Sequence, residues 1–163
     1  MLLQSDCEIL VKVFSGRASF AEMEDEEGEL IKNIALVFDL LHHLFVLGVR
    51  PPSGYPYHIV WAPRHENRSA DWVCNHAMQR GLGVDTVVDP RLREAELVLL
   101  ATDGGYRGDT GLGACSAIFY TTGSDQEACV GSFATVGKFA GNIKTELGAI
   151  VLGLQRLLQA WCV

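Results

Sequence analysis

Apolar residues recur along the chain with two spacings, and each spacing predicts a type of secondary structure. Helical spacing predicts helices over Cys7–Phe14, over Leu30–Phe45, in a segment ending near Arg80, and over Ile143–Trp161. Strand-like runs are predicted at Leu2–Asp6, Tyr57–Trp61, Leu97–Asp103, Gly113–Tyr120 and Ala128–Val136. The intervening segment Gly81–Arg93 is the least patterned part of the chain, and we predict that it is a linker. Strands and helices together predict an α/β fold.

The totals limit the classes of function. At 163 residues the chain is long enough for one domain with a sizeable core. A net charge of −7 gives no support to nucleic-acid binding by bulk electrostatics. Any such binding must therefore rest on a local patch of positive charge or on bound metal ions.

Cysteine usage and hydropathy bear on the compartment. The five cysteines are scattered, odd in number and without a C-x-x-C motif, which argues against a disulfide framework or a zinc site. No apolar run is long enough to cross a membrane, and the early acids Asp6 and Glu8 do not fit a signal peptide. We expect an intracellular protein, cytoplasmic or nuclear, with reduced thiols and no membrane partner.

Four carboxylates occupy similar places in the predicted elements. Asp6 and Asp103 end strands, whereas Asp71 and Glu146 lie about one turn into helices. Each acid alone also suits a turn or a helix start. Strand ends and the following helix starts meet at one edge of an α/β sheet, where ligands bind. Acids gathered there repel one another unless divalent cations lie among them, and Mg²⁺ or Mn²⁺ prefers such oxygen ligands.

Four short motifs carry a resemblance to a known family. They are Asp103-Gly104-Gly105 with Gly111 and Gly113 beyond it, N-x-x-x-E at Asn142–Glu146, SDCEILV at Ser5–Val11, and PRHENRSAD at Pro63–Asp71. Together they resemble the type 1 ribonuclease H domain, most of all its plant and retroelement-like branch, over most of the chain. The resemblance implies a ribonuclease H-like fold, in which helices flank a mixed five-stranded sheet.

The resemblance also implies an activity and a set of site residues. Asp103, Glu146, Asp6 and Asp71 would bind two Mg²⁺ ions, with Mn²⁺ able to substitute, and hydrolyse the RNA strand of RNA–DNA hybrids to leave 5′-phosphate ends. The backbone at Gly104 and Gly105, with Asn142, would contact the nucleic-acid backbone and the RNA 2′-hydroxyls. Candidate phosphate contacts are Arg64, Arg68, Lys138 and Lys144.

The motifs stand in a rotated order. The family runs through the equivalents of Asp103, Glu146, Asp6 and Asp71, whereas this chain begins with Asp6 and Asp71. We therefore expect one circularly permuted domain over 1–163: family C-terminal half at 1–80, linker at 81–95, family N-terminal half at 96–163. The alternative is a slice of a tandem array whose copies exchange halves in a dimer. The permuted monomer is favoured because a partner on the same chain has a high effective concentration.

Some features depart from the family or leave other functions open. An acidic run at 22–29 stands where some members carry a basic handle. His65 lies near the place of a loop histidine found in many members, but the short motif does not align it, and a helix-start role is favoured. One alternative function is a non-catalytic nucleic-acid-binding or assembly module derived from a retroelement or tandem array. Another is a different nuclease of the same superfold, such as an integrase-like or Holliday-junction enzyme.

Overall fold

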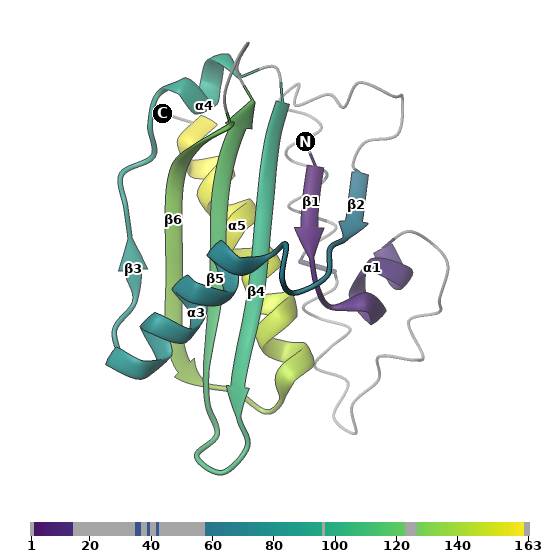
Figure 1. Ribbon diagram of the computed structural model, residues 1–163, viewed down its shortest axis with the longest axis vertical. Coiled ribbons are helices and arrows are strands. Elements are labelled where there is room, and N and C mark those ends of the chain that lie inside the picture. Colours follow the sequence, from purple (N-terminus) through teal and green to yellow (C-terminus); the bar gives the residue numbers. More distant parts are fainter. Residues whose placement is uncertain are drawn as a thin grey trace.

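The computed structural model describes residues 2–14, 35–36, 39, 42, 58–95, 97–122 and 127–161. Its strands form one mixed six-stranded sheet in the order β2-β1-β4-β5-β6-β3 (Figure 1). The strands are β1 (Leu2–Ser5), β2 (His58–Trp61), β3 (Val84–Asp85), β4 (Leu97–Arg107), β5 (Leu112–Thr122) and β6 (Glu127–Lys138). The helices are α1 (Glu8–Phe14), α3 (Arg68–Arg80), α4 (Arg91–Glu94) and α5 (Asn142–Trp161). The chain is therefore an α/β protein, as the sequence predicts.

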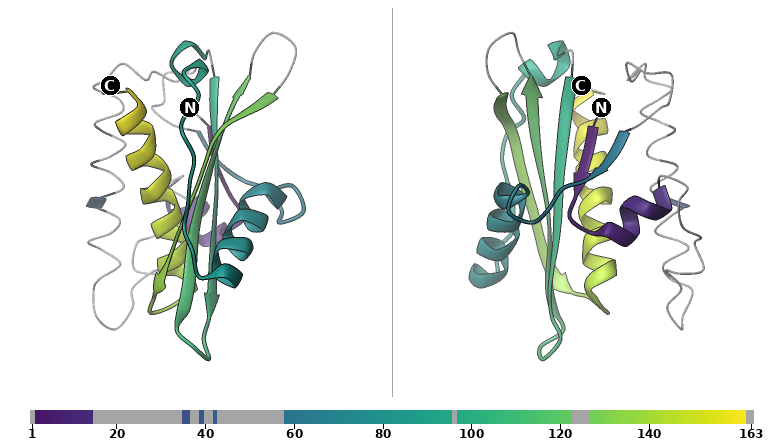
Figure 2. Two further views of the ribbon diagram at one scale, coloured as in Figure 1. Left: turned by 90° about the vertical axis from the view of Figure 1, so that its left-hand side faces the viewer. Right: turned by 45° about the vertical axis from the view of Figure 1, so that its right-hand side comes forward.

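Helices α5 and α3 cover opposite faces of the sheet (Figure 2). The larger core lies beneath α5 and combines its buried face with residues of β1, β4, β5 and β6, among them Leu3, Leu100, Phe119, Phe133, Leu147, Ile150, Leu154 and Leu157. On the other face α3 packs through the small residues Ala70 and Ala77, which bring the helix close to Ala101 and Ala134 of the sheet. Both helices present the inner faces that their apolar spacing predicts.

The central strand β4 changes its pairing partway along its length. β1 runs parallel to β4 and ends at Ser5, opposite Thr102. Beyond that point β4 continues to Arg107, paired with β5 in antiparallel register, and Asp103 lies opposite Ser116. The prediction that this strand ends at Asp103 is therefore wrong. Asp103 ends only the part of β4 that is flanked by β1, and the glycines after it pair with β5 although glycine disfavours strands.

The segment predicted to be a linker contains two regular elements. β3 pairs with β6 through Val84 and Asp85, so the sheet has six strands where five were expected. Thr86 and Ser132 exchange hydrogen bonds, and the Asp85 carboxylate accepts one of 2.6 Å from Arg156 on α5. The short helix α4 follows. A two-residue strand and a four-residue helix are too short to show a periodicity, which is why the sequence pattern misses them.

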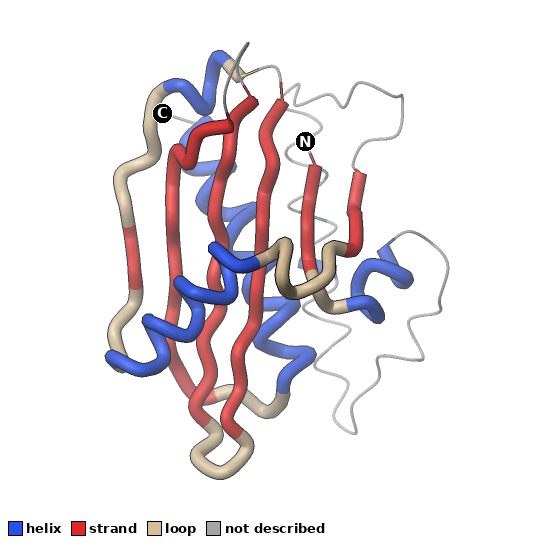
Figure 3. Tube along the Cα trace, in the orientation of Figure 1, coloured by secondary structure: helices blue, strands red, loops and turns tan. Residues whose placement is uncertain are grey.

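The other predicted elements appear with small shifts of their ends (Figure 3). The predicted elements at Cys7–Phe14, Tyr57–Trp61, Gly113–Tyr120, Ala128–Val136 and Ile143–Trp161 correspond to α1, β2, β5, β6 and α5. The acidic run 22–29 lies outside the described residues. So does the long helix expected from Leu30, apart from residues 35, 36, 39 and 42, which are helical. None of the helices in the described ranges is both long and apolar enough to span a membrane.

Gly104 lets α5 approach the backbone of β4. A methyl group built on Gly104 would lie 2.7 Å from Glu146 Cα and would overlap Glu146 N and Thr145 C, which belong to the helix backbone. Backbone atoms cannot turn aside as a flexible side chain can. The position therefore requires glycine because of the close packing of strand and helix, and its φ is not in the left-handed region.

Gly104→Ala should lower the free energy of unfolding by about 3 kcal/mol, because the added methyl group forces α5 away from β4. Gly108→Ala is the matched control in the β4–β5 turn, where the new methyl group would meet Tyr106 Cε1 at an ordinary 3.7 Å. Urea unfolding of both variants measures the difference. Equal stability of the two variants would contradict the close contact at Gly104.

Candidate metal centre

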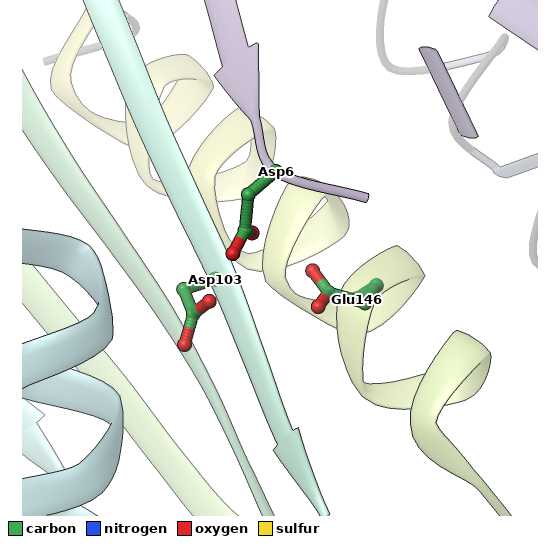
Figure 4. A group of neighbouring side chains, drawn as sticks. All are labelled: Asp6, Asp103 and Glu146. Atoms are coloured by element: carbon green, nitrogen blue, oxygen red, sulfur yellow. The ribbon is translucent and has the colours of Figure 1, made fainter. Parts of the chain in front are cut away.

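Three carboxylates from separate elements meet beside the end of β1. One oxygen from each of Asp6, Asp103 and Glu146 lies within 4.8 Å of the other two (Figure 4). Asp6 directly follows β1, Asp103 lies within β4, and Glu146 projects from α5. Asp103 and Glu146 are buried, and Asp6 is half-buried. The structure thus brings together three of the four acids that the sequence singles out.

The sheet register places the two aspartates side by side. Ser5 pairs with Thr102, so Asp6 and Asp103 each come one residue after the last pair of β1 and β4. Beyond this pair β1 has left the edge of β4. The backbone N–H of Gly104 then donates a 3.1 Å hydrogen bond to Glu146 Oε2. Glu146 is the fifth residue of α5 and so lies just beyond the first turn, one residue later than predicted.

Burial and mutual repulsion raise the pKa of two of these acids. Burial is the largest cause in both cases. The charges of Asp6 and Asp71 add to it and bring the pKa of Asp103 to about 7. For Glu146, the charges of Asp103 and Asp6 add to burial and bring the pKa to about 9, although the Gly104 N–H opposes this rise. Without a cation the cluster therefore retains protons at neutral pH.

The cluster fits a divalent cation. Asp6 Oδ1 is buried and has no hydrogen-bond partner among the described residues. A buried oxygen without a donor is costly, and a cation would satisfy it directly. Carboxylate oxygens from three elements are hard ligands of the kind that Mg²⁺, Mn²⁺ and Ca²⁺ take. Asp6, Asp103 and Glu146 could therefore bind a metal ion.

Asp71, the fourth predicted acid, does not join this trio. It lies in the first turn of α3, and its Oδ1 accepts hydrogen bonds from Arg64 Nε at 2.8 Å and Arg64 Nη2 at 2.5 Å. Its negative charge still raises the pKa of Asp103, so it belongs to the same electrostatic cluster. The start of α3 is fixed to the sheet because Asn67 Nδ2 donates a 2.8 Å hydrogen bond to Thr102 O.

A cavity of about 450 Å³ opens beside the trio. The predicted site residues that line it are Asp6, Asp103, Glu146, Gly104, Gly105, Asn142 and Arg64. Asp71, Arg68 and Lys144 are not among the residues that line it; Arg68 is exposed on the first turn of α3, and Lys144 is half-buried on α5. The Lys138 ammonium group donates a hydrogen bond to Thr110 O. The backbone and amide contacts expected at Gly104, Gly105 and Asn142 thus face the same space as the acids.

Sequence reasoning missed five further residues that line the cavity, namely Cys7, Asn75, Met78, Tyr106 and Arg107. Asn75 and Met78 stand four and seven residues after Asp71, on the same side of α3, so helical spacing from Asp71 could have found them. Tyr106 and Arg107 were missed because the strand was predicted to end at Asp103. Arg107 adds a positive charge at the far end of β4.

Cysteines surround the acids but remain thiols. Burial is the main cause that raises the pKa of Cys7 to about 11 and that of Cys115 to about 12, and it raises the pKa of Cys74 as well. All four described cysteines are free, as expected; Cys162 lies outside the described residues. His65 is exposed in the turn before α3, with its Nε2 3.7 Å from Glu66 Oε1, and it is not among the residues that line the cavity.

Comparison with known proteins adds no family assignment: no family model matches the chain, and no curated protein or solved structure matches it either.

The metal-free protein should lose stability as pH rises from about 4 to about 9. Asp103 and Glu146 titrate near 3.8 and 4.5 when unfolded, but near 7 and 9 when folded. The folded state therefore binds more protons in this window, and the free energy of unfolding falls with pH. We expect a loss of several kcal/mol across this window, measured by urea unfolding in a chelator.

Glu146→Gln should flatten this fall above pH 7, because the amide carries no charge and its oxygen can still accept from Gly104 N. Glu66→Gln is the control, since the Glu66 side chain is 62% exposed and lies outside the cavity. Identical pH profiles for the two variants would contradict the raised pKa of Glu146.

Proposed function

We propose that this protein is a metal-dependent endoribonuclease that hydrolyses the RNA strand of RNA–DNA hybrids. The observation that carries the proposal is the trio Asp6, Asp103 and Glu146, two of them buried, with a buried and unpartnered oxygen on Asp6. These are three of the four acids that the ribonuclease H-like motifs single out. Motifs far apart in the chain therefore converge on one cavity.

The arrangement of elements supports a ribonuclease H-like fold. Starting at β4, the chain passes through Asp103 on a central strand and Glu146 on α5. Starting again at β1, it passes through Asp6 at a strand end and Asp71 on α3. This strand–helix–strand–helix succession of acids is the family order. Apart from β3, the sheet has the expected five strands, mixed parallel and antiparallel.

The two halves of one chain can complete this sheet together, as the permuted monomer requires. The end of α5 and the start of β1 lie at the same end of the molecule, where the rotated order places the break (Figure 1). At the other junction, β3 and α4 carry the chain from α3 along the edge of β6 to β4.

The residues of the cavity divide into two roles. Asp6, Asp103 and Glu146 would hold Mg²⁺, with Mn²⁺ as a substitute. When bound, the metal would supply an activated water and would stabilise the leaving 3′-oxygen, which gives products with 5′-phosphate and 3′-hydroxyl ends. The backbone of Gly104 and Gly105 lies beside these acids and would face the RNA strand, whose 2′-hydroxyls distinguish it from DNA.

Positive charge at the cavity supplies the local attraction that the net charge of −7 does not. Arg64 and Arg107 both line the cavity, Arg64 from the turn before α3 and Arg107 from the end of β4. Guanidinium groups bind phosphate oxygens through two donors. Asn142, at the first residue of α5, would donate from its side-chain amide. These groups would orient the hybrid over the carboxylates.

Asp103→Asn should lower cleavage of a labelled RNA–DNA hybrid in Mg²⁺ by at least about a thousandfold, because it removes a charged ligand from the reacting centre. Asp109→Asn, in the exposed β4–β5 turn, is the matched control and should cleave like the wild type. Asp109 Oδ1 accepts from Thr110 N at 2.9 Å, which an asparagine oxygen can also do.

The assay should use the monomer fraction from a sizing column. Full activity of Asp103→Asn would contradict the assignment. Activity confined to a dimer fraction would point to exchanged halves. Hybrid binding without turnover in Mg²⁺ or Mn²⁺ would instead favour the non-catalytic binding module.

A further inference from the structure

Arg64, which lines the cavity, forms a close ion pair with Asp71. Its Nε and Nη2 both donate to one oxygen of Asp71, at 2.8 and 2.5 Å. Arg64 precedes α3 in a turn, and its side chain is 70% exposed, whereas that of Asp71 is 28% exposed. The guanidinium therefore reaches from the surface inward to the one predicted acid that stays outside the trio.

The same guanidinium acts on the trio. Arg64 lines the cavity together with Asp6, Asp103 and Glu146. Its positive charge counteracts part of the rise in the pKa of Asp103 and of Glu146. Among the described residues, Arg64 is thus the cavity-lining cation that pairs with Asp71 and also acts on the three carboxylates of the trio.

We propose that Arg64, one of the arginines that line this cavity, competes with a second divalent ion for Asp71. The inference rests on the proposed function and adds a regulation of the same site. A first ion needs only Asp6, Asp103 and Glu146. A second ion gains the Asp71 carboxylate only when Arg64 leaves it. The two ions should therefore bind with different affinities.

The energetics suit a competitor that can be displaced. A pair with a mostly exposed arginine contributes little to stability, and the arginine stem rotates readily. A guanidinium released from Asp71 remains beside the cavity, where a substrate phosphate is an alternative partner. Binding of nucleic acid would thus draw Arg64 from Asp71 and free that carboxylate for the second ion.

The test is a calorimetric titration of the metal-free full chain with Mn²⁺, without nucleic acid. Arg64→Gln should tighten the binding of the weaker of the two Mn²⁺ ions by about tenfold relative to the wild type, because Asp71 loses its competing partner. Arg64→Lys should give a smaller gain, since it keeps the charge but loses the paired donors. Arg68→Gln is the matched control: it removes an exposed arginine four residues away, and Arg68 does not line the cavity.

The gain in affinity for the weaker Mn²⁺ ion must also depend on Asp71. Adding Asp71→Asn to Arg64→Gln should remove it, whereas a change in overall field alone would persist in the double variant. Thermal unfolding of each variant checks that the fold is intact, as the exposure of Arg64 predicts.

The outcomes separate the two proposals. One ion with equal affinity in the wild type and Arg64→Gln would overturn the competition but leave the trio as a metal site. A weaker second ion in Arg64→Gln would also overturn it, since Arg64 would then be holding Asp71 in place as a ligand. No ion in either protein would overturn both the competition and the proposed function.

Discussion

Repulsion among buried carboxylates is the constraint on which the rest of this structure depends. Asp6, Asp103 and Glu146 each place an oxygen within 4.8 Å of the others, in a region where burial already disfavours charge. The fold offsets the repulsion only in part, through the Gly104 N–H and the Arg64 guanidinium. The remainder appears as the raised pKa of Asp103 and Glu146. An arrangement so costly to stability is typical of a site kept for function.

Backbone contacts between the elements fix where these groups meet. The last pair of β1 and β4 fixes the two aspartates, and the close contact of α5 with Gly104 fixes Glu146. Asn67, bonded to Thr102 O, sets the start of α3 beside the same residues. Because backbone positions move little, the acids cannot separate to relieve their repulsion. Protons, Arg64 or metal ions must neutralise them instead.

The sequence predicts those parts of this arrangement that are carried by periodicity. The core faces of α3 and α5, and the strand that ends before Asp6, follow from apolar spacing over many residues. The sequence pattern does not predict β3 and α4, because they are too short to show a period and their stability comes from contacts with β6 and α5. The end of β4 was misplaced because an acid and two glycines suggest a turn, while pairing with β5 overrides that local preference.

The candidate site, too, could be predicted from the sequence only in part. Three of the four acids could be brought together from the sequence because β1 ends beside Asp103 and the first turns of α5 lie against the same part of β4, although β4 itself continues. The pairing of Asp71 with Arg64 could not be predicted, since it depends on the side-chain conformation of an exposed arginine. The sequence indicates only that Arg64 is a cation near the cavity. Side-chain pairing is decided after the backbone is set, among alternatives close in energy.

Chain order matters little to a site of this kind. The contacts that build it join residues distant in sequence: Ser5 with Thr102, Asn67 with Thr102, and Gly104 with Glu146. None of them depends on which half of the chain comes first, provided that the segment joining the two halves spans the distance between them without strain. β3 does this along the edge of β6, where Thr86 and Ser132 exchange hydrogen bonds and Arg156 holds Asp85. The junction thereby also covers a sheet edge that would otherwise be open to pairing with another chain. A rotated order of motifs is therefore compatible with an intact carboxylate cluster, because spatial register, and not sequence order, determines where the acids meet.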